Sequence, residues 1–505
     1  MNIVKCQTLD GQPVEFVHTN DPLSGLMKEV YFSPDRSYVV AFYKKELDAI
    51  GMMRLTKLVG EYRDRLYNSS SGHYWQNLFC WPDAIVQHEG RTGIRMPVYP
   101  DHFFFKHGSF DQDRLKLQGK DKEGKWFAAN KPRKMLDSRE LGDWLSYLRI
   151  CLKLARAIRR LHLTGLAHSD LSYKNVLIDP VGTNVCVIDI DGLVVPNLFP
   201  PDVVGTPDFI APEVIATNHL AKSDPDRVLP SRLTDLYALS VLIYMYLLHR
   251  HPLKDGKKIF DMDDDKKDDD LRMGQSALFI EHPTDHSNSI DCHKLEPGRL
   301  PWHNTQKRPY RLTGPYLSKL FDRAFIDSLH KPNQRPAATD WEHALVETMN
   351  LLLPCSNSQC EEKWFVFDST QANHAVCPFC ETCYDNEIPL FGDLMFWRGG
   401  QYHREQKEIV GWDGLSLYRW HINGLFGYDE NTSEEDSKRV AYIQYYNHKW
   451  LLVNEAIADL TDVSNEKNPV PIGIGSYITL RNNLVLSFGK EHGARKARVS
   501  LISRR

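Results

Sequence analysis

The sequence predicts an α+β protein of three or four domains, a number that 505 residues can support. Short apolar runs between turn residues, at 29–32, 38–43 and 84–86, predict hairpins near the N-terminus. The apolar spacing of residues 141–162 indicates a long helix. From residue 388 onward, short apolar and aromatic runs alternate with turn signals, which is typical of an antiparallel sandwich.

The composition excludes several classes of protein. Hydrophobic residues make up 42% and charged residues 25% of the chain, which is ordinary for a soluble globular protein. A net charge of −4 gives no electrostatic footprint for nucleic acid. There is no apolar run of 18 residues, and the first residues lack the basic and apolar regions of a signal peptide. We therefore expect a cytoplasmic protein that binds neither nucleic acid nor membrane, and the basic run at 489–505 is interpreted as a solvated tail.

Residues 166–213 contain side chains with the spacing that phosphoryl transfer requires. Asn175 follows Asp170 by five residues, and Asp189 comes just after a strand-like run. Moving a γ-phosphoryl group needs a carboxylate that accepts or orients the attacking hydroxyl, and two oxygen ligands for Mg²⁺. Asp170 fits the first role, and Asn175 with Asp189 fits the second.

The order of these motifs resembles that of the protein kinases. The chain reads HSDLSYKN from His168, DIDG from Asp189 and APE up to Glu213. It lacks the family's Arg beside the catalytic Asp and the Lys two residues after it. Asp191 stands where the family has Gly, so that either Asp could bind metal; Asp189 is the expected main ligand.

This resemblance implies a bilobal protein-kinase-like fold with an N-lobe at 1–100 and a C-lobe at 101–350. It also implies ATP and Mg²⁺ as cofactors and a protein Ser/Thr substrate. The alternatives are a nucleotide-binding pseudokinase scaffold, which the missing glycines and the missing Lys favour, and a pure protein-interaction module.

The resemblance also assigns nucleotide-binding residues in the N-lobe. Gly25 and Val30 are what remains of the phosphate-covering loop. Lys44 is expected to bind the α- and β-phosphates, with Lys45 on the opposite face of the strand as the alternative. Glu61, near the end of an amphipathic helix predicted over 47–66, is expected to position Lys44.

Two further residues are assigned near the base. Met96 is expected behind the adenine, and Val98 lies in the segment that would offer backbone groups to the adenine.

Lys28, at a hairpin tip, is interpreted as a surface residue, although it could neutralise phosphate charge. Residues 106–135 show no clear periodicity and predict a long surface loop.

The C-lobe resemblance implies two structural contacts and one unusual loop. Asp235 would hold the backbone of the catalytic loop, and Arg335 would pair with Glu213.

Ser169 replaces the Arg that binds a loop phosphate in many kinases, and residues 190–205 contain no hydroxyl side chain. We therefore expect the loop to be held without phosphorylation, by apolar packing of Leu193, Val194, Val195, Leu198 and Phe199, with Thr206 bracing the catalytic loop. The acidic run 261–270 is interpreted as a solvated loop.

Five of the ten cysteines fall between residues 355 and 383. Two close pairs can supply the four thiolates of a tetrahedral Zn²⁺ site and predict a zinc ribbon at 351–387. The expected ligands are Cys355, Cys360, Cys377 and Cys380. Cys383 is an alternative fourth ligand and His374 a weaker one.

Residues 388–505 predict an all-β sandwich that resembles a forkhead-associated domain. The family's S-R-x-H-A is S-K-R-V-A here, from Ser437 to Ala441, so Arg439 or Arg419 would have to meet a phosphate. With the kinase lobes and the ribbon, the chain resembles a bacterial kinase family associated with tellurite-resistance gene clusters. That resemblance implies a von Willebrand factor-like protein and a metal-dependent protein phosphatase as partners.

Overall fold

A computed structural model of the chain describes residues 2–25, 27–195, 205–257, 271–371 and 375–503. These residues form two compact units. The first contains residues 1–142, 146–310 and 319–342, and the second contains residues 143–145, 311–318 and 343–505. Among the described helices, none combines the length and the apolar character needed to cross a bilayer.

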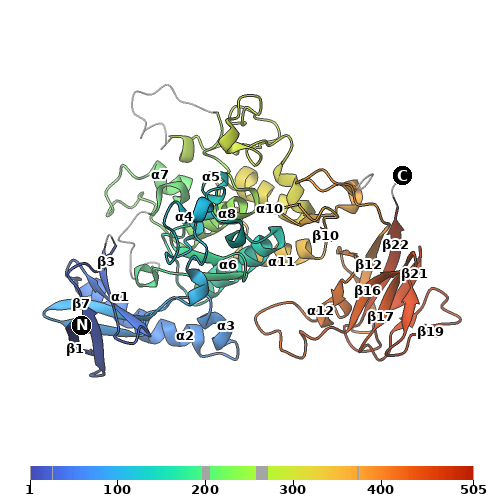
Figure 1. Cartoon of the computed structure of the whole chain (residues 1–505), viewed down its shortest axis with the longest axis horizontal. Helices are drawn as coiled ribbons and strands as arrows, with labels where there is room; N and C mark the ends of the chain where they lie inside the picture. Colours follow the sequence, from blue (N-terminus) through green and yellow to red (C-terminus); the bar gives the residue numbers. More distant parts are fainter. Residues whose placement is uncertain (1, 26, 196–204, 258–270, 372–374, 504–505) are drawn as a thin grey trace. The chain divides into compact units, whose positions relative to one another are not determined.

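A seven-stranded antiparallel sheet forms the N-terminal part of the first unit, drawn in blue in Figure 1. In spatial order its strands are β2 (Pro13–His18), β1 (Asn2–Thr8), β6 (Ala84–His88), β7 (Arg91–Pro97), β5 (Tyr38–Tyr43), β4 (Lys28–Phe32) and β3 (Leu23–Ser24). The predicted hairpins β4–β5 and β6–β7 are confirmed. The β1–β2 hairpin was not predicted; its Val14 and Phe16 pack against Phe42 on one face of the sheet.

The helix predicted over 47–66 is present but irregular. It consists of α1 (Ala49–Lys57), a π-helical turn (Leu58–Tyr62) and α2 (Arg63–Tyr67). The Asp48 side chain caps α1 by accepting a hydrogen bond of 2.7 Å from the Gly51 N–H. Leu55 packs on Ala41 of β5, so α1 covers the face of the sheet opposite to Phe16.

Helices dominate the remainder of the first unit. The two longest are α6 (Trp144–Leu163), predicted over 141–162, and α8 (Arg232–Leu248), whose N-terminus carries a capping box of Ser231 and Thr234. Nearly every residue of α8 is buried, which matches its continuous apolar run. The other elements that lie wholly or partly in this unit are α3 (Gly72–Gln76), α4 (Phe110–Asp113), α5 (Asn130–Arg133), β8 (Val176–Asp179), β9 (Asn184–Val187), α7 (Pro212–Ala216), α10 (Gly314–Asp322) and α11 (Ala338–Met349).

The prediction of a surface loop at 106–135 is wrong. Phe127 and Ala128 are fully buried there. Lys122 is also buried, with its ammonium 3.0 Å from Glu140 and 3.1 Å from Asp179. The segment folds as buried loops with short helical turns at 124–126 and 130–133, which leave no periodic pattern in the sequence. Two carboxylates compensate the buried charge of Lys122.

The second unit contains a small hairpin. Strands β10 (Leu352–Pro354) and β11 (Trp364–Val366) pair antiparallel, and β11 lies between the two cysteine pairs in the sequence. Phe365 and Phe367 pack with Cys360 and Cys377 in a separate apolar cluster.

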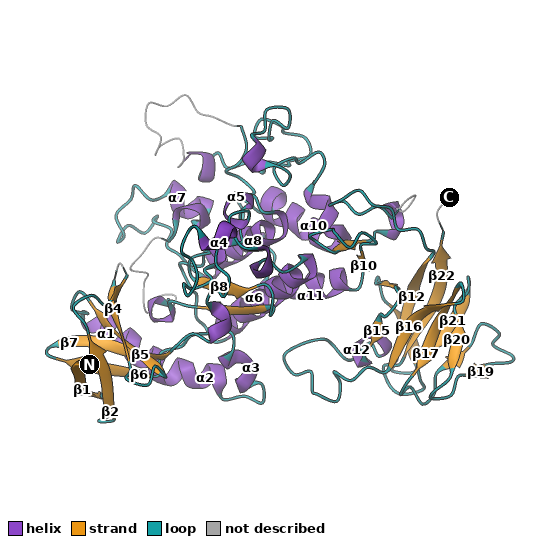
Figure 2. Cartoon of the chain, in the orientation of Figure 1, coloured by secondary structure: helices purple, strands orange, loops and turns teal. Residues whose placement is uncertain are grey.

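Two antiparallel sheets follow and share one core, and Figure 2 shows that this part is almost entirely strand and loop. One sheet has the order β13 (Gln401–Arg404), β12 (Ile388–Arg398), β22 (Arg495–Ile502), β21 (Leu484–Ser487), β18 (Thr461–Asp462) and β19 (Val470–Pro471), with β14 (Ile409–Val410) on β12. The other has the order β15 (Ser416–Leu417), β16 (Ala441–Tyr446), β17 (Lys449–Asn454) and β20 (Tyr477–Thr479), and one short helix, α12 (Arg419–Ile422), lies in the same part of the sequence.

The interpretation of the C-terminal basic run as a solvated tail is also wrong. Residues 495–502 form β22, which pairs with both β12 and β21. Arg495 is 5% exposed and forms two hydrogen bonds with Glu405, at 2.5 and 2.8 Å. Alternating small and apolar residues such as Ala497 and Val499 fill the core, while the charged residues between them gave the run its basic character.

Candidate active site and cysteine cluster

The loop between α6 and β8 is held by a buried carboxylate. Asp235 of α8 is 1% exposed and accepts hydrogen bonds from the N–H groups of His168 and Ser169, at 2.7 and 3.0 Å. This is the contact that the resemblance implied for Asp235. Ser169 adopts a left-handed backbone conformation, with φ of 66°, and the bond to Asp235 helps to hold it there.

Asp170 follows directly and is oriented by three donors. Its Oδ1 accepts the N–H and the hydroxyl of Thr206, at 2.6 and 2.8 Å. Its Oδ2 lies 3.1 Å from the Asn175 Nδ2, which also donates to the Asp170 backbone oxygen at 2.8 Å. The structure thus brings Asp170, Asn175 and Thr206 together. Because the Asn175 amide nitrogen donates both of these bonds, its amide oxygen is not needed for the contact with Asp170.

Two further carboxylates follow β9, in very different surroundings. The Asp189 side chain is 49% exposed, and its backbone is left-handed, with φ of 61°. The Asp191 side chain is only 6% exposed. Burial alone would raise the pKa of Asp191, but the neighbouring ammonium group of Lys28 and the hydroxyl of Tyr43 lower it below its usual value.

Lys28 joins these two carboxylates and is not a surface residue. Its Nζ lies 3.1 Å from Asp189 Oδ1 and 2.6 and 2.8 Å from the two oxygens of Asp191. The Lys28 side chain is 15% exposed. Burial lowers the pKa of Lys28, but Asp191 and Asp189 more than reverse this effect and raise it above its usual value. In the β4–β5 ladder Lys28 lies opposite Tyr43, whose hydroxyl donates to Asp191.

The structure does not form the expected pair of Lys44 and Glu61. The Lys44 ammonium donates to the Gly25 carbonyl at 2.7 Å. Glu61 is exposed and forms ion pairs with Lys57, at 3.6 Å, and Arg65 on its own helix. Among the described contacts of Glu61 there is none to Lys44.

The reason lies in the face of β5 that was chosen. By the alternation of a strand, Lys44 belongs to the face of Val40 and Phe42, and these side chains pack against the β1–β2 hairpin. The face that carries Ala41 and Tyr43 is the one that α1 covers. Lys45 follows on that second face but lies beyond the end of β5 and is exposed.

A cavity of about 120 Å³ brings these groups together. Its lining includes Lys28, Tyr43, Asp170, Asp189 and Asp191, and α1 contributes further side chains. The predicted Asp170 and Asp189 therefore line one cavity with Lys28, which was interpreted as a surface residue, and with Tyr43, which was not predicted.

The remaining predicted nucleotide residues lie in the N-lobe sheet and its exit. Gly25 closes a turn with its N–H on the Lys28 carbonyl at 3.0 Å, and a Cβ there would meet only that carbonyl, at 3.8 Å, so the position does not require glycine. Val30 pairs with Leu23 and Ala41. Their contact with a nucleotide stays a prediction.

At the exit of the sheet, Met96 packs against two apolar clusters, one under α1 and one that contains Leu177 of β8. The Val98 N–H lies 3.5 Å from the Ser37 carbonyl, which is a weak hydrogen bond. Their contacts with the base also stay predictions.

Two other expectations for the C-lobe can be compared with the structure. Arg335 forms two hydrogen bonds with Glu213, at 2.8 and 2.7 Å, as expected. Leu193 and Val194 are buried, and Val194 exchanges backbone hydrogen bonds of 2.8 and 2.9 Å with Ala167. Leu198, Phe199 and the acidic run 261–270 lie outside the described residues.

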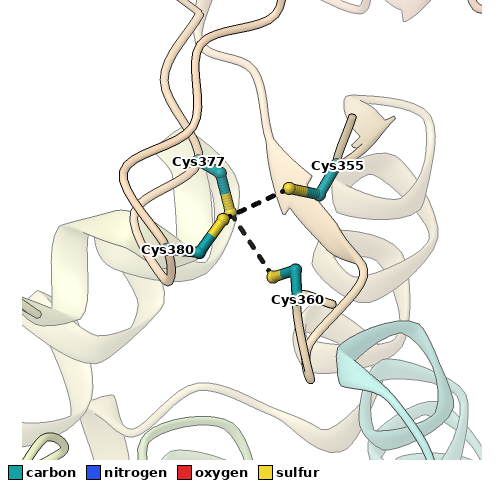
Figure 3. A group of neighbouring side chains, drawn as sticks. All are labelled: Cys355, Cys360, Cys377 and Cys380. Carbon is teal, nitrogen blue, oxygen red and sulfur yellow. Dashed lines mark hydrogen bonds between the residues drawn. The ribbon is translucent and has the colours of Figure 1, made fainter. Parts of the chain in front are cut away.

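Four cysteines of the second unit converge as predicted (Figure 3). Their sulfur atoms all lie within 4.8 Å of one another, with 3.4 Å between Cys355 and Cys380 and 3.9 Å between Cys360 and Cys377. A tetrahedron with Zn–S bonds of about 2.3 Å has sulfur atoms about 3.8 Å apart, so the cluster fits Zn²⁺. Cys383 is not part of this cluster, and His374 lies outside the described residues.

The arginines considered for phosphate binding in the all-β part both contact carboxylates. Arg439 forms two hydrogen bonds of 2.6 Å with Glu455. Arg419 donates to Asp436 at 2.7 Å and stacks on Phe426. A phosphate would have to displace these acidic partners.

Comparison with known proteins is consistent with this geometry. Residues 125–311 match the protein kinase domain family. A stretch of 132 residues is 30% identical to the serine/threonine-protein kinase dkf-1 of Caenorhabditis elegans, covering 25% of this chain and 17% of that protein. A stretch of 156 residues is 28% identical to the serine/threonine-protein kinase PknD of Chlamydia felis, covering 26% of this chain and 15% of that protein.

These comparisons support the enzyme class expected from the sequence, a protein serine/threonine kinase. The match spans only 15–17% of the length of these two relatives, and the family match begins after the N-terminal sheet. Among solved structures, the kinase domain of a Toxoplasma gondii specific rhoptry antigen aligns with a TM-score of 0.38 and 13% identity, over 69% of this chain and 86% of that one.

Proposed function

We propose that the chain is an ATP- and Mg²⁺-dependent protein kinase that phosphorylates Ser or Thr of a protein substrate. The observation that carries this proposal is the orientation of Asp170 by Thr206 and Asn175 beside the cavity that Asp189 lines. A carboxylate fixed in this way can accept the proton of a substrate hydroxyl as that hydroxyl attacks phosphorus. The similarity to serine/threonine kinases supports the choice of acceptor.

The residues around Asp170 have the donor chemistry that Mg²⁺ prefers. Mg²⁺ would neutralise the charge of the transferring phosphates, and carboxylate and amide oxygens are its usual protein ligands. Asp189 and the amide oxygen of Asn175 would hold it. Asn175 also orients Asp170, so one side chain links the position of the metal to that of the proton acceptor.

The test is transfer of labelled phosphate from ATP to casein in the presence of Mg²⁺. Wild type should label Ser or Thr, and Asp170→Asn should lower the rate by at least about 10³-fold, because the proton acceptor is lost. The matched control is Asp64→Asn, an exposed carboxylate on α2, which should behave as wild type. Transfer at the wild-type rate by Asp170→Asn would contradict the proposal.

A nucleotide-binding scaffold without transfer activity is the second candidate. Ser169 and Ser172 favour it, because they replace the Arg and Lys of the kinase catalytic loop. Binding of Mg²⁺–ATP by wild type without any transfer would select this alternative.

We also propose roles for the two C-terminal parts. The four clustered cysteines would hold one structural Zn²⁺. The all-β part would serve as a protein-interaction domain related to forkhead-associated domains. The partners proposed for it are the von Willebrand factor-like protein and the phosphatase of the tellurite-resistance family. Only the resemblance supports these partners. Arg419 is paired with Asp436 and Arg439 with Glu455, which argues against phosphothreonine as the ligand of these two arginines.

A further inference from the structure

The cation that reaches the cavity carboxylates comes from β4, not from β5. Lys28 begins β4, and its ammonium group contacts Asp189 and both oxygens of Asp191. Lys44, one residue past the end of β5, contacts the Gly25 carbonyl. Of these two lysines, only Lys28 lines the cavity.

The pairing of the two strands explains how Lys28 reaches this position. Lys28 and Tyr43 are directly opposite each other in the β4–β5 ladder, so their side chains lie on the same face of the sheet. This is the face of Ala41, which α1 covers. Tyr43 fills the β5 position on that face and donates its hydroxyl to Asp191.

We propose that Lys28 binds the α- and β-phosphates of the nucleotide, and that Asp191 positions Lys28 in the role expected for Glu61. This inference rests on the proposed kinase function. It replaces the predicted pair of Lys44 and Glu61 by the pair of Lys28 and Asp191. The Tyr43 hydroxyl also donates a hydrogen bond to Asp191.

The geometry supplies a donor for the phosphate. An ammonium group has three N–H donors, and in the structure they face Asp189 and the two oxygens of Asp191. If Asp189 were to bind Mg²⁺ in place of Lys28, one N–H donor of Lys28 would become available to a phosphate oxygen. The two bonds to Asp191 remain and hold the side chain in place.

The first test compares lysine variants by calorimetric titration with Mg²⁺–ATP. Lys28→Met keeps the aliphatic stem and should weaken binding by at least about tenfold, because a charge-assisted contact is lost. Lys44→Met should weaken binding by less than about fivefold, as expected for an exposed lysine. Lys5→Met, on β1 with a side chain 79% exposed, is the control and should bind as wild type. A larger loss in Lys44→Met than in Lys28→Met would overturn the inference.

The second test moves the lysine across the ladder. Adding Tyr43→Lys to Lys28→Met returns an ammonium group to the same face and should restore part of the affinity for Mg²⁺–ATP. Tyr43→Phe added to Lys28→Met changes the same position without a cation and should restore nothing. Equal affinities for these two double variants, with both folded by circular dichroism, would refute the assignment.

The third test concerns Asp191 as a positioning residue. Asp191→Asn should raise the KM for ATP in wild type and leave it nearly unchanged in the Lys28→Met background, because the two side chains act as one unit. If Asp191→Asn raised the KM for ATP equally in the wild-type and Lys28→Met backgrounds, Asp191 would not be the residue that positions Lys28. Full transfer activity and full ATP affinity in Lys28→Met would overturn the inference alone, whereas a wild type that neither binds nor uses ATP would overturn the proposed function with it.

Discussion

Thr206 gives both its backbone N–H and its hydroxyl to the same oxygen of Asp170, at 2.6 and 2.8 Å. Thr206→Val removes the hydroxyl and keeps the shape of the side chain. We expect kcat to fall by about tenfold or more, the cost of losing a hydrogen bond to a charged group, with little change in the KM for ATP. Thr206→Ser should keep most of the rate. Steady-state kinetics checks both, and a Thr206→Val variant with the wild-type kcat would show that this bond does not orient Asp170.

Thr206 is a poor site for an activating phosphate, because its hydroxyl already donates a hydrogen bond to Asp170. A phosphate there would remove the donor and bring like charge beside the carboxylate. Residues 190–205 offer no other hydroxyl. Phosphatase-treated enzyme should therefore keep its rate, and mass spectrometry should find these residues unmodified. A large loss of activity traced to phosphate on Thr206 would contradict this expectation.

The two carboxylates after β9 should differ in their effect on metal-dependent catalysis. Asp189 is half exposed toward the cavity, whereas Asp191 is buried against Lys28 and Tyr43. Asp189→Ala should abolish Mg²⁺-dependent turnover, and Asp191→Ala should be milder. Rates measured across a Mg²⁺ titration check the ranking. The reverse order would place the main metal ligand two residues further on.

Purified protein should contain about one equivalent of Zn²⁺, bound by the four clustered cysteines. Cys377→Ser with Cys380→Ser should lose it, while Cys383→Ser, outside the cluster, should retain it. Metal analysis by mass spectrometry measures both. The variant without zinc should also unfold at lower temperature, because Cys360 and Cys377 belong to the same apolar cluster as Phe365. Wild-type protein without zinc would refute the site.

Acid should weaken the all-β part through His421. Burial, with Arg495 nearby, lowers the pKa of His421 to about 3, and its Nδ1 accepts the Tyr418 N–H at 3.0 Å, which requires an unprotonated nitrogen. A histidine in the unfolded chain has a pKa of about 6.5. The stability that neutral His421 contributes is therefore complete above pH 6.5 and is lost as the pH falls toward 3.

When the pH falls from 7 to 5, protonation of His421 in the unfolded chain lowers the free energy of unfolding by about 2 kcal/mol. Hydrogen exchange of β16 amides should show that much loss of protection free energy in wild type. His421→Gln cannot titrate, and its protection should change by about 2 kcal/mol less over the same range. Identical pH dependence in the two proteins would exclude His421 as the titrating group.

Local patterns were sufficient to predict the longer elements. The apolar spacing of α6 and the turn between β4 and β5 predicted their positions to within a few residues. The four cysteines also converge as predicted, because two closely spaced cysteine pairs can be recognised in the sequence itself. These features depend on neighbours that are close along the chain.

The errors concern groups that are far apart along the chain. The assignment of Lys44, with Lys45 as the alternative, depended on which face of β5 faces the cavity. The β1–β2 hairpin covers the Phe42 face, so the cavity lies on the other one. Two basic residues expected at the surface are mostly shielded from solvent, because Asp191 provides a counter-charge to Lys28 and Glu405 one to Arg495. A signal for Lys28 did exist: it lies opposite the last residue of β5 once the hairpin turn is counted.

The position of β22 has a consequence for synthesis of the chain. This strand lies between β12 and β21, and Ile502 pairs with Ile388. During translation β12 leaves the ribosome long before its partner, so its edge remains unpaired until residue 502 has emerged. An unpaired edge of this kind can join the edges of other chains. The central pairing of this sheet can therefore form only after β22 has been made.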